Sequence, residues 1–437
     1  MSQRPRFFYG WVIVTIAFIM MVVGYAMRNT FAVFYPTLVE EFGWARGSTA
    51  LMFSINIIVY GLTAPIAGGL ADRFSPRVVF PIGIAIMGGS IALCSIADQQ
   101  WQFFLLYGVG AAFGLSMTGV TTLNTLVARW FVKRRALAFS IFNTGFGFGL
   151  LGSPIVQSLI SGLGRREAYL SIGLFAIVFL VPLIVVFLRR SPADKGTVPD
   201  GGEERPAFTA DSLQQETAMT AWSRTEWTLS RALRTRTFWL IFAADFFMMG
   251  IAQQVQIAHS VYFFRDAGFT AQAAANVFSF YGVGIIIGYM FAYVSDRVGR
   301  ERVMVPGCLT AATGTALLFA IHGPGLTWLG AICMFLCGLG MGASVTTFFA
   351  TVADLFGGKH YGSIMGFVTF GFSLGGAFSP WFVGYLNDVT GGYSIALGMV
   401  VVALVVAAIL VRLAAPSRLR PVAGMRPVTP KSARGTT

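Results

Sequence analysis

Arg28 is the residue whose type and setting point most directly to chemistry, because it stands alone in a long apolar stretch (MMVVGYAMRNTFAVFY). A guanidinium stays charged and binds a carboxylate through two parallel hydrogen bonds. An arginine at the centre of a membrane helix costs about 2.5–3.5 kcal/mol, so it usually faces a polar partner or a wet cavity. We therefore expect Arg28 to bind a carboxylate substrate. The alternative is a side chain that reaches the outer membrane surface, since Arg28 lies 18 residues past Gly10, or about 27 Å of helix.

The second half of the chain offers polar partners at equivalent positions. The stretch FGW after the first apolar segment resembles a later AGF at an offset of 225 residues. The same offset places Gln253 and Gln254 opposite Arg28 and Asn29. Polar pairs at one depth in two related helices favour a site between the halves over contact with lipid. We expect Asn29, Gln253 and Gln254 to hydrogen-bond the substrate.

Hydroxyl groups form a second candidate lining. Thr118 and Thr121 fall on one helix face, and an offset of 226 places Thr347 opposite Thr121. Such hydroxyls either line a cavity or bond the carbonyl groups of their own helices. Asn143, Asn276 and Tyr281 are further candidate hydrogen-bond donors in predicted helices. The remaining predicted substrate-binding residues are therefore Thr118, Thr121, Asn143, Asn276, Tyr281 and Thr347.

Two titratable residues in one predicted helix are candidates for proton coupling. Asp245 lies seven residues into that helix and His259 lies near its outer end. A histidine titrates near neutral pH and can relay protons. The alternatives are a gate or packing role for Asp245 and an interfacial position for His259.

Paired charges in two short loops predict a gate on the cytoplasmic side. GGLADRFSPRVV in the first half corresponds to AYVSDRVGRERV in the second, with the aspartates 224 residues apart. Opposite charges at helix ends can hold the inner side shut, although basic loops also serve simply as topology signals. The predicted gate residues are Asp72, Arg73, Arg77, Asp296, Arg297 and Arg300.

Composition identifies the elements that position these residues. Hydrophobic residues make up 56% of the chain and charged residues only 11%, against roughly 25% charged in soluble domains. Apolar blocks long enough to span a bilayer predict an all-α membrane protein with twelve transmembrane helices. The predicted helices span residues 9–35, 48–70, 78–97, 102–127, 136–160, 168–188, 238–264, 272–294, 303–321, 326–350, 361–386 and 393–413.

The repeats divide the predicted helices into two pseudo-symmetric six-helix bundles related by a parallel repeat. The domains are an N-terminal bundle at 1–188, a cytoplasmic linker at 189–237, a C-terminal bundle at 238–413 and a cytoplasmic tail at 414–437. Within the linker, residues 222–236 mix aromatic residues with arginine and predict an amphipathic helix on the inner leaflet. A solvated linker is the alternative.

Basic residues fix the predicted orientation. Twenty-six of the 31 Lys and Arg residues fall in segments on one side of the membrane, four fall on the other side, and Arg28 lies within a helix. Since cytoplasmic loops are enriched in Lys and Arg, we expect both termini to be cytoplasmic in a multi-pass protein of the cell (inner) membrane. This distribution explains the net charge of +13 without a nucleic-acid partner.

The sequence gives little support to catalysis. The four cysteines lie in apolar segments without His or carboxylate nearby, and the three histidines are widely separated, so we expect no metal site, no cofactor and no catalytic residue. The phosphate-binding pattern G-x-x-x-x-G-K-[ST] does not occur, so ATP is not expected to drive the protein. A membrane-embedded enzyme and a non-transporting sensor are therefore less favoured than a transporter.

Two groups of motifs carry a family resemblance. GGLADRFSPR resembles the major-facilitator signature, with Ser75 at a position that is usually glycine. YGWVIV and WFVKRRALAFSIFNTGFGFG are similar to segments of the monocarboxylate porters and the oxalate/formate antiporters. The resemblance implies the major-facilitator fold and transport of small carboxylates such as lactate or pyruvate, often with a proton. The family's helix-8 arginine and aspartate correspond here to Gly288 and Gly284, so Arg28 is expected to supply the positive charge.

Together these features predict a secondary active transporter of a small, monocarboxylate-like organic anion that works by alternating access. Proton coupling, as symport or antiport, is a hypothesis. The alternative is a proton-driven exporter of hydrophobic or aromatic compounds, which the 41 phenylalanines would suit. The expected partners are the anion, protons and the lipid bilayer, and the protein is expected to be monomeric.

Overall fold

The computed structural model describes residues 8–131, 134–200, 226–357 and 360–419. Twelve helical segments in these ranges are long and apolar enough to cross a membrane, which confirms the predicted count. These spans are Gly10–Phe42, Arg46–Leu70, Pro76–Leu93, Gln100–Trp130, Leu137–Leu163, Arg165–Phe187, Arg236–Asp266, Ala271–Phe291, Glu301–Ala320, Pro324–Phe356, Tyr361–Thr390 and Ser394–Ala414.

Several spans are built from more than one helical segment. The first half contains α1 (Gly10–Asn29), α2 (Phe31–Phe42), α3 (Arg46–Arg73), α4 (Pro76–Leu93), α5 (Gln100–Phe103), η1 (Phe104–Ala111), α6 (Ala112–Thr118), α7 (Val120–Trp130), α8 (Arg135–Asn143), α9 (Gly145–Leu150), α10 (Ser153–Leu163), α11 (Arg165–Phe187) and η2 (Pro192–Lys195). The second half contains α13 (Leu229–Leu233), α14 (Arg236–Asp245), η3 (Phe246–Gln253), α15 (Gln254–Asp266), α16 (Ala271–Val298), α17 (Glu301–Leu317), η4 (Leu318–Ala320), η5 (Pro324–Leu326), α18 (Thr327–Phe356), α19 (Tyr361–Thr390), α20 (Ser394–Ala414) and α21 (Pro416–Leu419).

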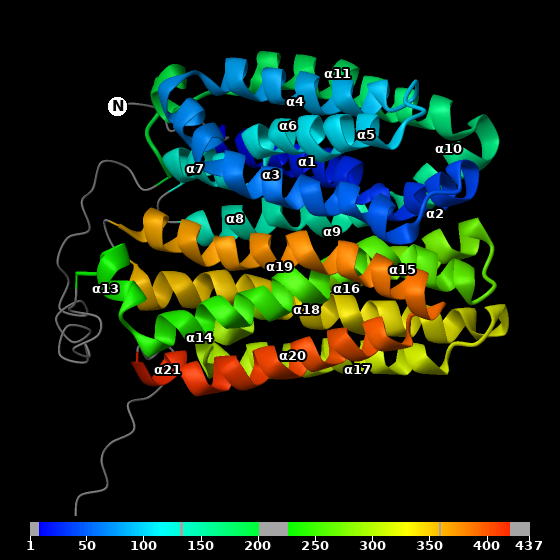
Figure 1. The fold of residues 1–437 in the computed structure, drawn as a ribbon. Coiled ribbons are helices and arrows are strands. Elements are labelled where there is room, and N and C mark those ends of the chain that lie inside the picture. The colour runs from blue at the N-terminus through cyan, green and yellow to red at the C-terminus, as the bar shows by residue number, and fades with distance from the viewer. Residues whose placement is uncertain (1–7, 132–133, 201–225, 358–359, 420–437) are drawn as a thin grey trace, which may run out of the picture.

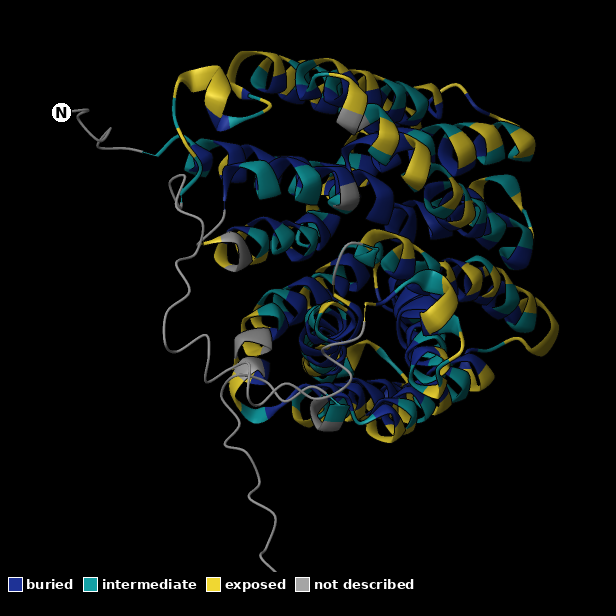
Figure 2. Ribbon diagram, turned by 90° about the vertical axis from the view of Figure 1, so that its left-hand side faces the viewer, coloured by how far each residue is buried: buried dark blue, intermediate teal, exposed yellow. Residues whose placement is uncertain are grey.

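The two halves form separate bundles that lie side by side, as Figure 1 shows. Within the first bundle α4 packs on α11 and α1 packs on α9, whereas within the second α18 lies between α16 and α17. The bundles meet mainly where α3 packs on α19, where α16 packs on α9 and α10, and where α2 packs on α15. Figure 2 shows that buried residues face the inside of each bundle and exposed residues cover its outside.

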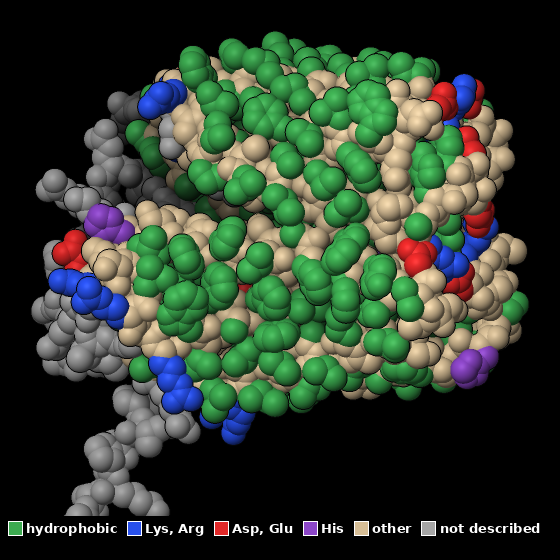
Figure 3. Space-filling view, in the orientation of Figure 1, with side chains coloured by type: hydrophobic (Ala, Val, Ile, Leu, Met, Phe, Trp, Pro, Cys, Tyr) green, Lys and Arg blue, Asp and Glu red, His purple; other side chains and the backbone are tan. Residues whose placement is uncertain are grey.

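The outer surface has the distribution that a bilayer requires. Figure 3 shows hydrophobic side chains over the middle of the molecule and charged side chains gathered at its two ends. Large apolar residues such as Val178 and Phe175 on α11 are 71% and 57% exposed. Because so much exposed apolar surface is stable only in lipid, the chain is an integral multi-pass membrane protein.

The bundles are in close contact at one end and part toward the other. At the end where α2 and α15 meet, a Cβ added to Gly47 of α3 would lie 2.9 Å from the backbone nitrogen of Tyr385 of α19, and one added to Gly61 would lie 2.3 Å from Ser373 Oγ. Two helical turns further along the same faces, a Cβ on Gly68 or on Gly366 would meet nothing within 4 Å. Helices α3 and α19 therefore diverge beyond Gly61, toward the end that carries the N-terminus and the central linker.

The predicted linker helix is only partly described. Residues 222–225 lie outside the described ranges, and α13 contains five residues. Trp227 is 8% exposed and packs edge-on against Phe356, with 5.2 Å between the ring centroids. This tryptophan and Ala232 are buried, so one side of the described part of the segment packs on the second bundle.

Candidate functional site

Arg28 lies at the end of α1, where the first span is interrupted before it continues as α2. The break falls at Thr30, whose hydroxyl donates to the carbonyl oxygen of Met27 at 2.7 Å. Since the whole span runs from Gly10 to Phe42, Arg28 lies near its middle. The residue is 7% exposed, so its side chain is buried within the protein and does not reach the membrane surface.

Aromatic rings surround the guanidinium of Arg28, but two of its nitrogen atoms have no hydrogen-bond partner. The carbon Cζ lies 5.5 Å from the ring centroid of Phe53 and 5.4 Å from that of Tyr60, where a cation is attracted by the ring faces. The buried atoms Nε and Nη2 donate to no acceptor in the described part of the protein. These two nitrogen atoms form the edge of the guanidinium that can bind both oxygens of a carboxylate.

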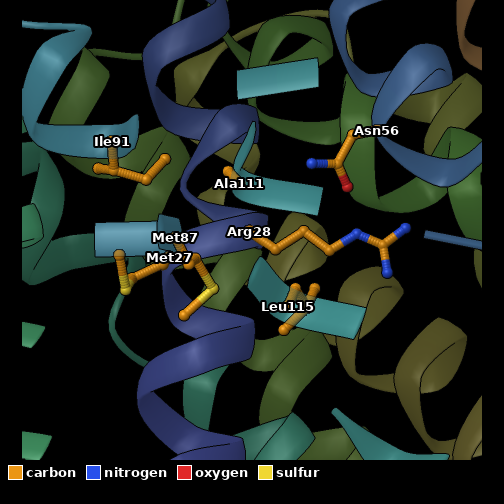
Figure 4. Close-up of a pocket in the computed structure, with 7 residues that line it drawn as sticks. All are labelled: Met27, Arg28, Asn56, Met87, Ile91, Ala111 and Leu115. Carbon is orange, nitrogen blue, oxygen red and sulfur yellow. The ribbon is translucent and has the colours of Figure 1, made fainter. Parts of the chain in front are cut away.

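Asn56 and Tyr107 complete the surroundings of Arg28 and were not predicted. Tyr107 donates its hydroxyl to the carbonyl oxygen of Arg28 at 2.7 Å and accepts, at its own carbonyl, the Nδ2 of Asn56 at 2.9 Å. Figure 4 shows that Asn56 and Arg28 line one small pocket. The signal in the sequence was a single asparagine within an apolar helix (MFSINIIVY), the same kind of signal that identified Arg28.

Of the two residues predicted opposite Arg28, Gln254 lies at the interface of the bundles, whereas Gln253 hydrogen-bonds Tyr281 of the second bundle. Gln253 and Gln254 are 4% and 3% exposed. A Cβ on Gly376 of α19 would lie 3.0 Å from both Gln254 and Ile57, so Gln254 approaches α3 beside Asn56. Asn29 is 3% exposed, and its Nδ2 has no partner.

The threonine hydroxyls that the structure describes among those predicted to line a cavity form hydrogen bonds within their own helices. The Oγ1 of Thr118 donates to the carbonyl oxygen of Gly114 at 3.1 Å, and that of Thr347 donates to Ala343 at 2.7 Å. The side chain of Thr121 lies outside the described part of the structure. Both described hydroxyls therefore bond the carbonyls of their own helices.

The other single candidates also have protein partners. Asn143 donates its Nδ2 to the carbonyl oxygen of Phe139 at 2.8 Å. Asn276 is exposed and accepts from Gln272 at 3.1 Å. Tyr281 is fully buried and donates to Oε1 of Gln256 at 3.3 Å, which places it inside the second bundle.

The two candidates for proton coupling have different surroundings. Asp245 is 1% exposed; its Oδ2 accepts from the backbone nitrogen of Phe372 at 3.1 Å, and its Oδ1 has no partner. His259 is 2% exposed, and both of its ring nitrogens are engaged, by the hydroxyl of Tyr393 at 3.1 Å and the carbonyl of Pro380 at 2.8 Å. One carboxyl oxygen of Asp245 is therefore available for a proton.

The predicted cytoplasmic gate is only partly described. The side chains of Asp72 and Asp296 lie outside the described part, and Arg73 and Arg297 are exposed. Arg77 donates to the carbonyl oxygen of Leu188 at 2.7 Å. Arg300 pairs with Asp354 at 2.8 Å, and each of these two arginines thus binds a group of its own half.

Ion pairs join the halves at the opposite end, where the sequence did not predict a gate. Arg46 pairs through two hydrogen bonds with Asp266, and Arg265 pairs with Glu40 at 2.7 Å. The carboxylate of Asp388 accepts the backbone nitrogens of Arg46 at 2.9 Å and of Gly47 at 2.7 Å. Figure 3 shows acidic and basic side chains grouped at the right-hand end of the molecule. We call Glu40, Arg46, Arg265, Asp266 and Asp388 the outer latch.

The absence of the family's charges on helix 8 has a packing explanation. A Cβ on Gly284 would lie 2.3 Å from the carbonyl oxygen of Phe335, and one on Gly288 would lie 2.5 Å from that of Leu339. Both glycines therefore face the backbone of α18 too closely for any side chain. An arginine at these positions would have to separate α16 from α18.

Comparison with known proteins identifies the family. The family model described as Major Facilitator Superfamily matches residues 17–357 and 260–435. The uncharacterized MFS-type transporter YcxA of Bacillus subtilis (strain 168) is 24% identical over 413 residues, 92% of this chain and 94% of the relative. Monocarboxylate transporter 13 of Rattus norvegicus is 24% identical over 396 residues, 90% and 86% of the two chains. The oxalate:formate antiporter of Oxalobacter formigenes is 23% identical over 308 residues, 67% and 65% of the two chains.

A solved structure agrees with the fold. A bacterial homologue of the human lysosomal transporter Spinster, in an inward-facing and occupied conformation, superposes with a TM-score of 0.65 at 16% identity and covers 95% of this chain and 98% of that one. The family and the named relatives are transporters rather than enzymes. With the family model matching most of its length, this chain belongs to the Major Facilitator Superfamily.

Proposed function

We propose that this protein is a secondary active transporter of a small, monocarboxylate-like organic anion. The observation that carries the proposal is the buried guanidinium of Arg28, whose Nε and Nη2 have no partner. A buried charge without a partner is strongly unfavourable, and a carboxylate from outside the protein would supply both missing acceptors. The names of the relatives, which include monocarboxylate transporters and an oxalate:formate antiporter, agree with this chemistry.

The charge of the site suits an anion with a single carboxylate. Arg28 is the only Lys or Arg near the middle of a described span, because Arg46, Arg165 and Arg265 lie at span ends. A second carboxylate on the substrate would have no cation to pair with at this depth. The unpaired Nδ2 of Asn29, together with Gln253 and Gln254, would donate further hydrogen bonds.

The arrangement of the two bundles supports an alternating-access mechanism. The outer latch joins them at one end, and α3 and α19 diverge at the other. Since the basic loops lie at the divergent end, the positive-inside rule makes this an inward-facing state of a protein with both termini in the cytoplasm. We place the protein, as a monomer, in the cell (inner) membrane. Opening outward would require the latch to break.

We assign proton coupling to Asp245 rather than to His259. The unpaired Oδ1 of Asp245 can hold a proton without breaking an existing bond, whereas both nitrogens of His259 are engaged. His259 also contacts Tyr35 of the first bundle, with 5.4 Å between ring centroids, close to the outer latch. A role in closing the outer side suits it better.

Uptake into proteoliposomes tests the proposal. Radiolabelled formate, acetate, lactate, pyruvate and oxalate are offered with and without an inwardly directed proton gradient. We expect uptake of monocarboxylates by the wild type, none by Arg28→Ala, and normal uptake by the control Arg166→Ala, an exposed arginine. Asp245→Asn should remove the response to the gradient. Unchanged uptake in Arg28→Ala would remove the proposal, and drug efflux insensitive to carboxylates would favour the exporter.

A further inference from the structure

Asn56 presents an unpaired acceptor inside the first bundle. The residue is 1% exposed, and its Nδ2 donates to the carbonyl oxygen of Tyr107 at 2.9 Å. Because only the amide nitrogen can donate to a carbonyl, this bond fixes the orientation of the amide. The Oδ1 is therefore turned away from the Tyr107 carbonyl, and it has no hydrogen-bond partner among the residues that the structure describes.

The unpaired acceptor shares its pocket with the unpaired donors of Arg28. Figure 4 shows the Asn56 amide oxygen turned toward the guanidinium. The same tyrosine holds both groups, since the hydroxyl of Tyr107 binds the backbone of Arg28 at 2.7 Å while its carbonyl binds Asn56. Arg28 and Asn56 therefore present two unpaired donors and one unpaired acceptor to the same region of the first bundle. The lining residues are Met27, Arg28, Asn56, Met87, Ile91, Ala111 and Leu115.

A molecule that satisfies all three groups carries a carboxylate and, next to it, a hydroxyl. The carboxylate oxygens accept from Nε and Nη2 of Arg28, and the hydroxyl donates to Oδ1 of Asn56. A 2-oxo acid would instead place a second acceptor against Oδ1, and an unsubstituted acid would leave Oδ1 unpaired, which is unfavourable for a buried group. We propose that Asn56 is a specificity-determining residue that selects 2-hydroxy monocarboxylates over 2-oxo monocarboxylates. This inference rests on the proposed function of Arg28.

The side chains around the pocket allow it to expand. In the present state the pocket has essentially no room for a water molecule. Two of its lining residues, Met27 and Met87, are unbranched thioethers that adapt their shape readily. Movement of these side chains would enlarge the pocket without displacing Tyr107. The hydrogen bond from Asn56 to Tyr107 holds the amide, whereas the apolar lining can adjust.

A three-carbon series tests the inference in proteoliposomes. Uptake of lactate, pyruvate and propionate is measured for the wild type, Asn56→Leu and Asn56→Ser. The wild type should take up lactate at least about tenfold more efficiently than pyruvate, because a buried acceptor would otherwise stay unpaired. In Asn56→Leu the ratio should fall to about one. Asn387→Leu, which removes a buried asparagine with an unpaired Nδ2 outside this pocket, should keep the wild-type ratio.

The outcomes separate this inference from the proposed function. Equal uptake of lactate and pyruvate by the wild type would overturn the role of Asn56 and leave the role of Arg28 intact, and this comparison does not depend on any variant folding. A drop by one common factor for all three acids in both Asn56 variants would also overturn it, since Asn56 would then only support Arg28. Absence of uptake of every carboxylate by the wild type would overturn both proposals.

Discussion

Two arginines of the first bundle are both buried beside aromatic rings, but only one of them has a carboxylate partner. Arg165 at the start of α11 is 5% exposed, and its guanidinium lies near the rings of Phe42 and Phe103, at 4.9 and 5.9 Å. Its Nε and Nη2 bind the two carboxylate oxygens of Glu41 at 2.7 and 3.0 Å. Arg28 is equally buried and likewise flanked by two rings, but the same two nitrogens are unpaired.

The difference supports separate roles for the two arginines. In Arg165 the guanidinium is neutralised by the protein, and its Nη1 also lies 3.3 Å from the carbonyl of Cys94, so the residue ties the outer ends of helices together. In Arg28 the protein supplies the aromatic surroundings and omits the carboxylate. A site prepared for an anion that arrives and leaves would have this composition, because a permanent internal partner would compete with the cargo.

A carboxylate placed beside Arg28 should give this arginine an internal partner like that of Arg165. We expect this change to reduce transport more than any other substitution considered below. Asn56→Asp places an acid in the pocket beside Arg28. A charge-assisted bond within the protein is worth about 1.5–3 kcal/mol, so we expect monocarboxylate uptake to fall about a hundredfold. Uptake into proteoliposomes measures the effect, with Asn387→Asp as the control for adding an acid elsewhere. Full activity of Asn56→Asp would contradict a carboxylate site at Arg28.

Removing the carboxylate partner of Arg165 should leave this arginine without an anionic partner, as Arg28 is. Glu41→Gln leaves a buried guanidinium with a weaker partner, and we expect the free energy of unfolding to decrease by about 2 kcal/mol. The melting temperature in detergent measures this change. Glu167→Gln changes an exposed acid in α11, the helix that carries Arg165. This substitution should leave the melting temperature unchanged within error. An equal effect of both substitutions would mean that the pair does not stabilise the fold.

Substituting Arg28 itself should leave the free energy of unfolding unchanged or increase it slightly. Arg28→Met replaces an unpaired buried charge by an apolar chain of similar length, so we expect stability in the absence of substrate to stay the same or to increase by about 1 kcal/mol. Arg165→Met in the same assay should destabilise the protein. Strong destabilisation by Arg28→Met would indicate that Arg28 has a structural partner after all.

The outer latch offers the smallest expected effect. Partly exposed ion pairs contribute about 0.2–1 kcal/mol, so Asp266→Asn should raise the outward-facing population only about threefold. Hydrogen–deuterium exchange in residues 384–391 should then become faster. Asp98→Asn breaks an exposed pair within the first half, with Arg166 at 2.9 Å, and should leave that exchange unchanged. The latch assignment fails if both variants behave alike.

The sequence was sufficient to predict the fold, and it singled out Arg28 as the central candidate. Long apolar blocks predict twelve spans because the bilayer demands them, and the repeated loops predict two related bundles. Arg28 was recognisable because a charged side chain within an apolar membrane helix is energetically unfavourable whichever side of the helix it lies on. The first helix was predicted to end at residue 35 but continues to Phe42, past Pro36, because the acidic residues beyond it lie at the outer end and take part in pairs.

The partners of the central residue could not be predicted. Whether Thr118 faces a cavity or bonds Gly114 depends on a side-chain rotation that no spacing reveals. Asn56 became a candidate only when the fold brought α3 beside α1 and turned one amide atom toward Tyr107. Arg46 and Asp266 are 220 residues apart, and neither carries a motif, so only the packing of the two bundles shows that they pair.

Equilibrium binding of lactate to the purified protein tests the central claim most directly. The comparison is between the wild type and Arg28→Met, which is expected to be at least as stable, so lost binding cannot be ascribed to misfolding. Loss of a bidentate charge-assisted pair should weaken binding about a hundredfold, while Arg166→Met should bind like the wild type. An unchanged Kd in Arg28→Met would contradict the account, because the anion would then be held by other groups.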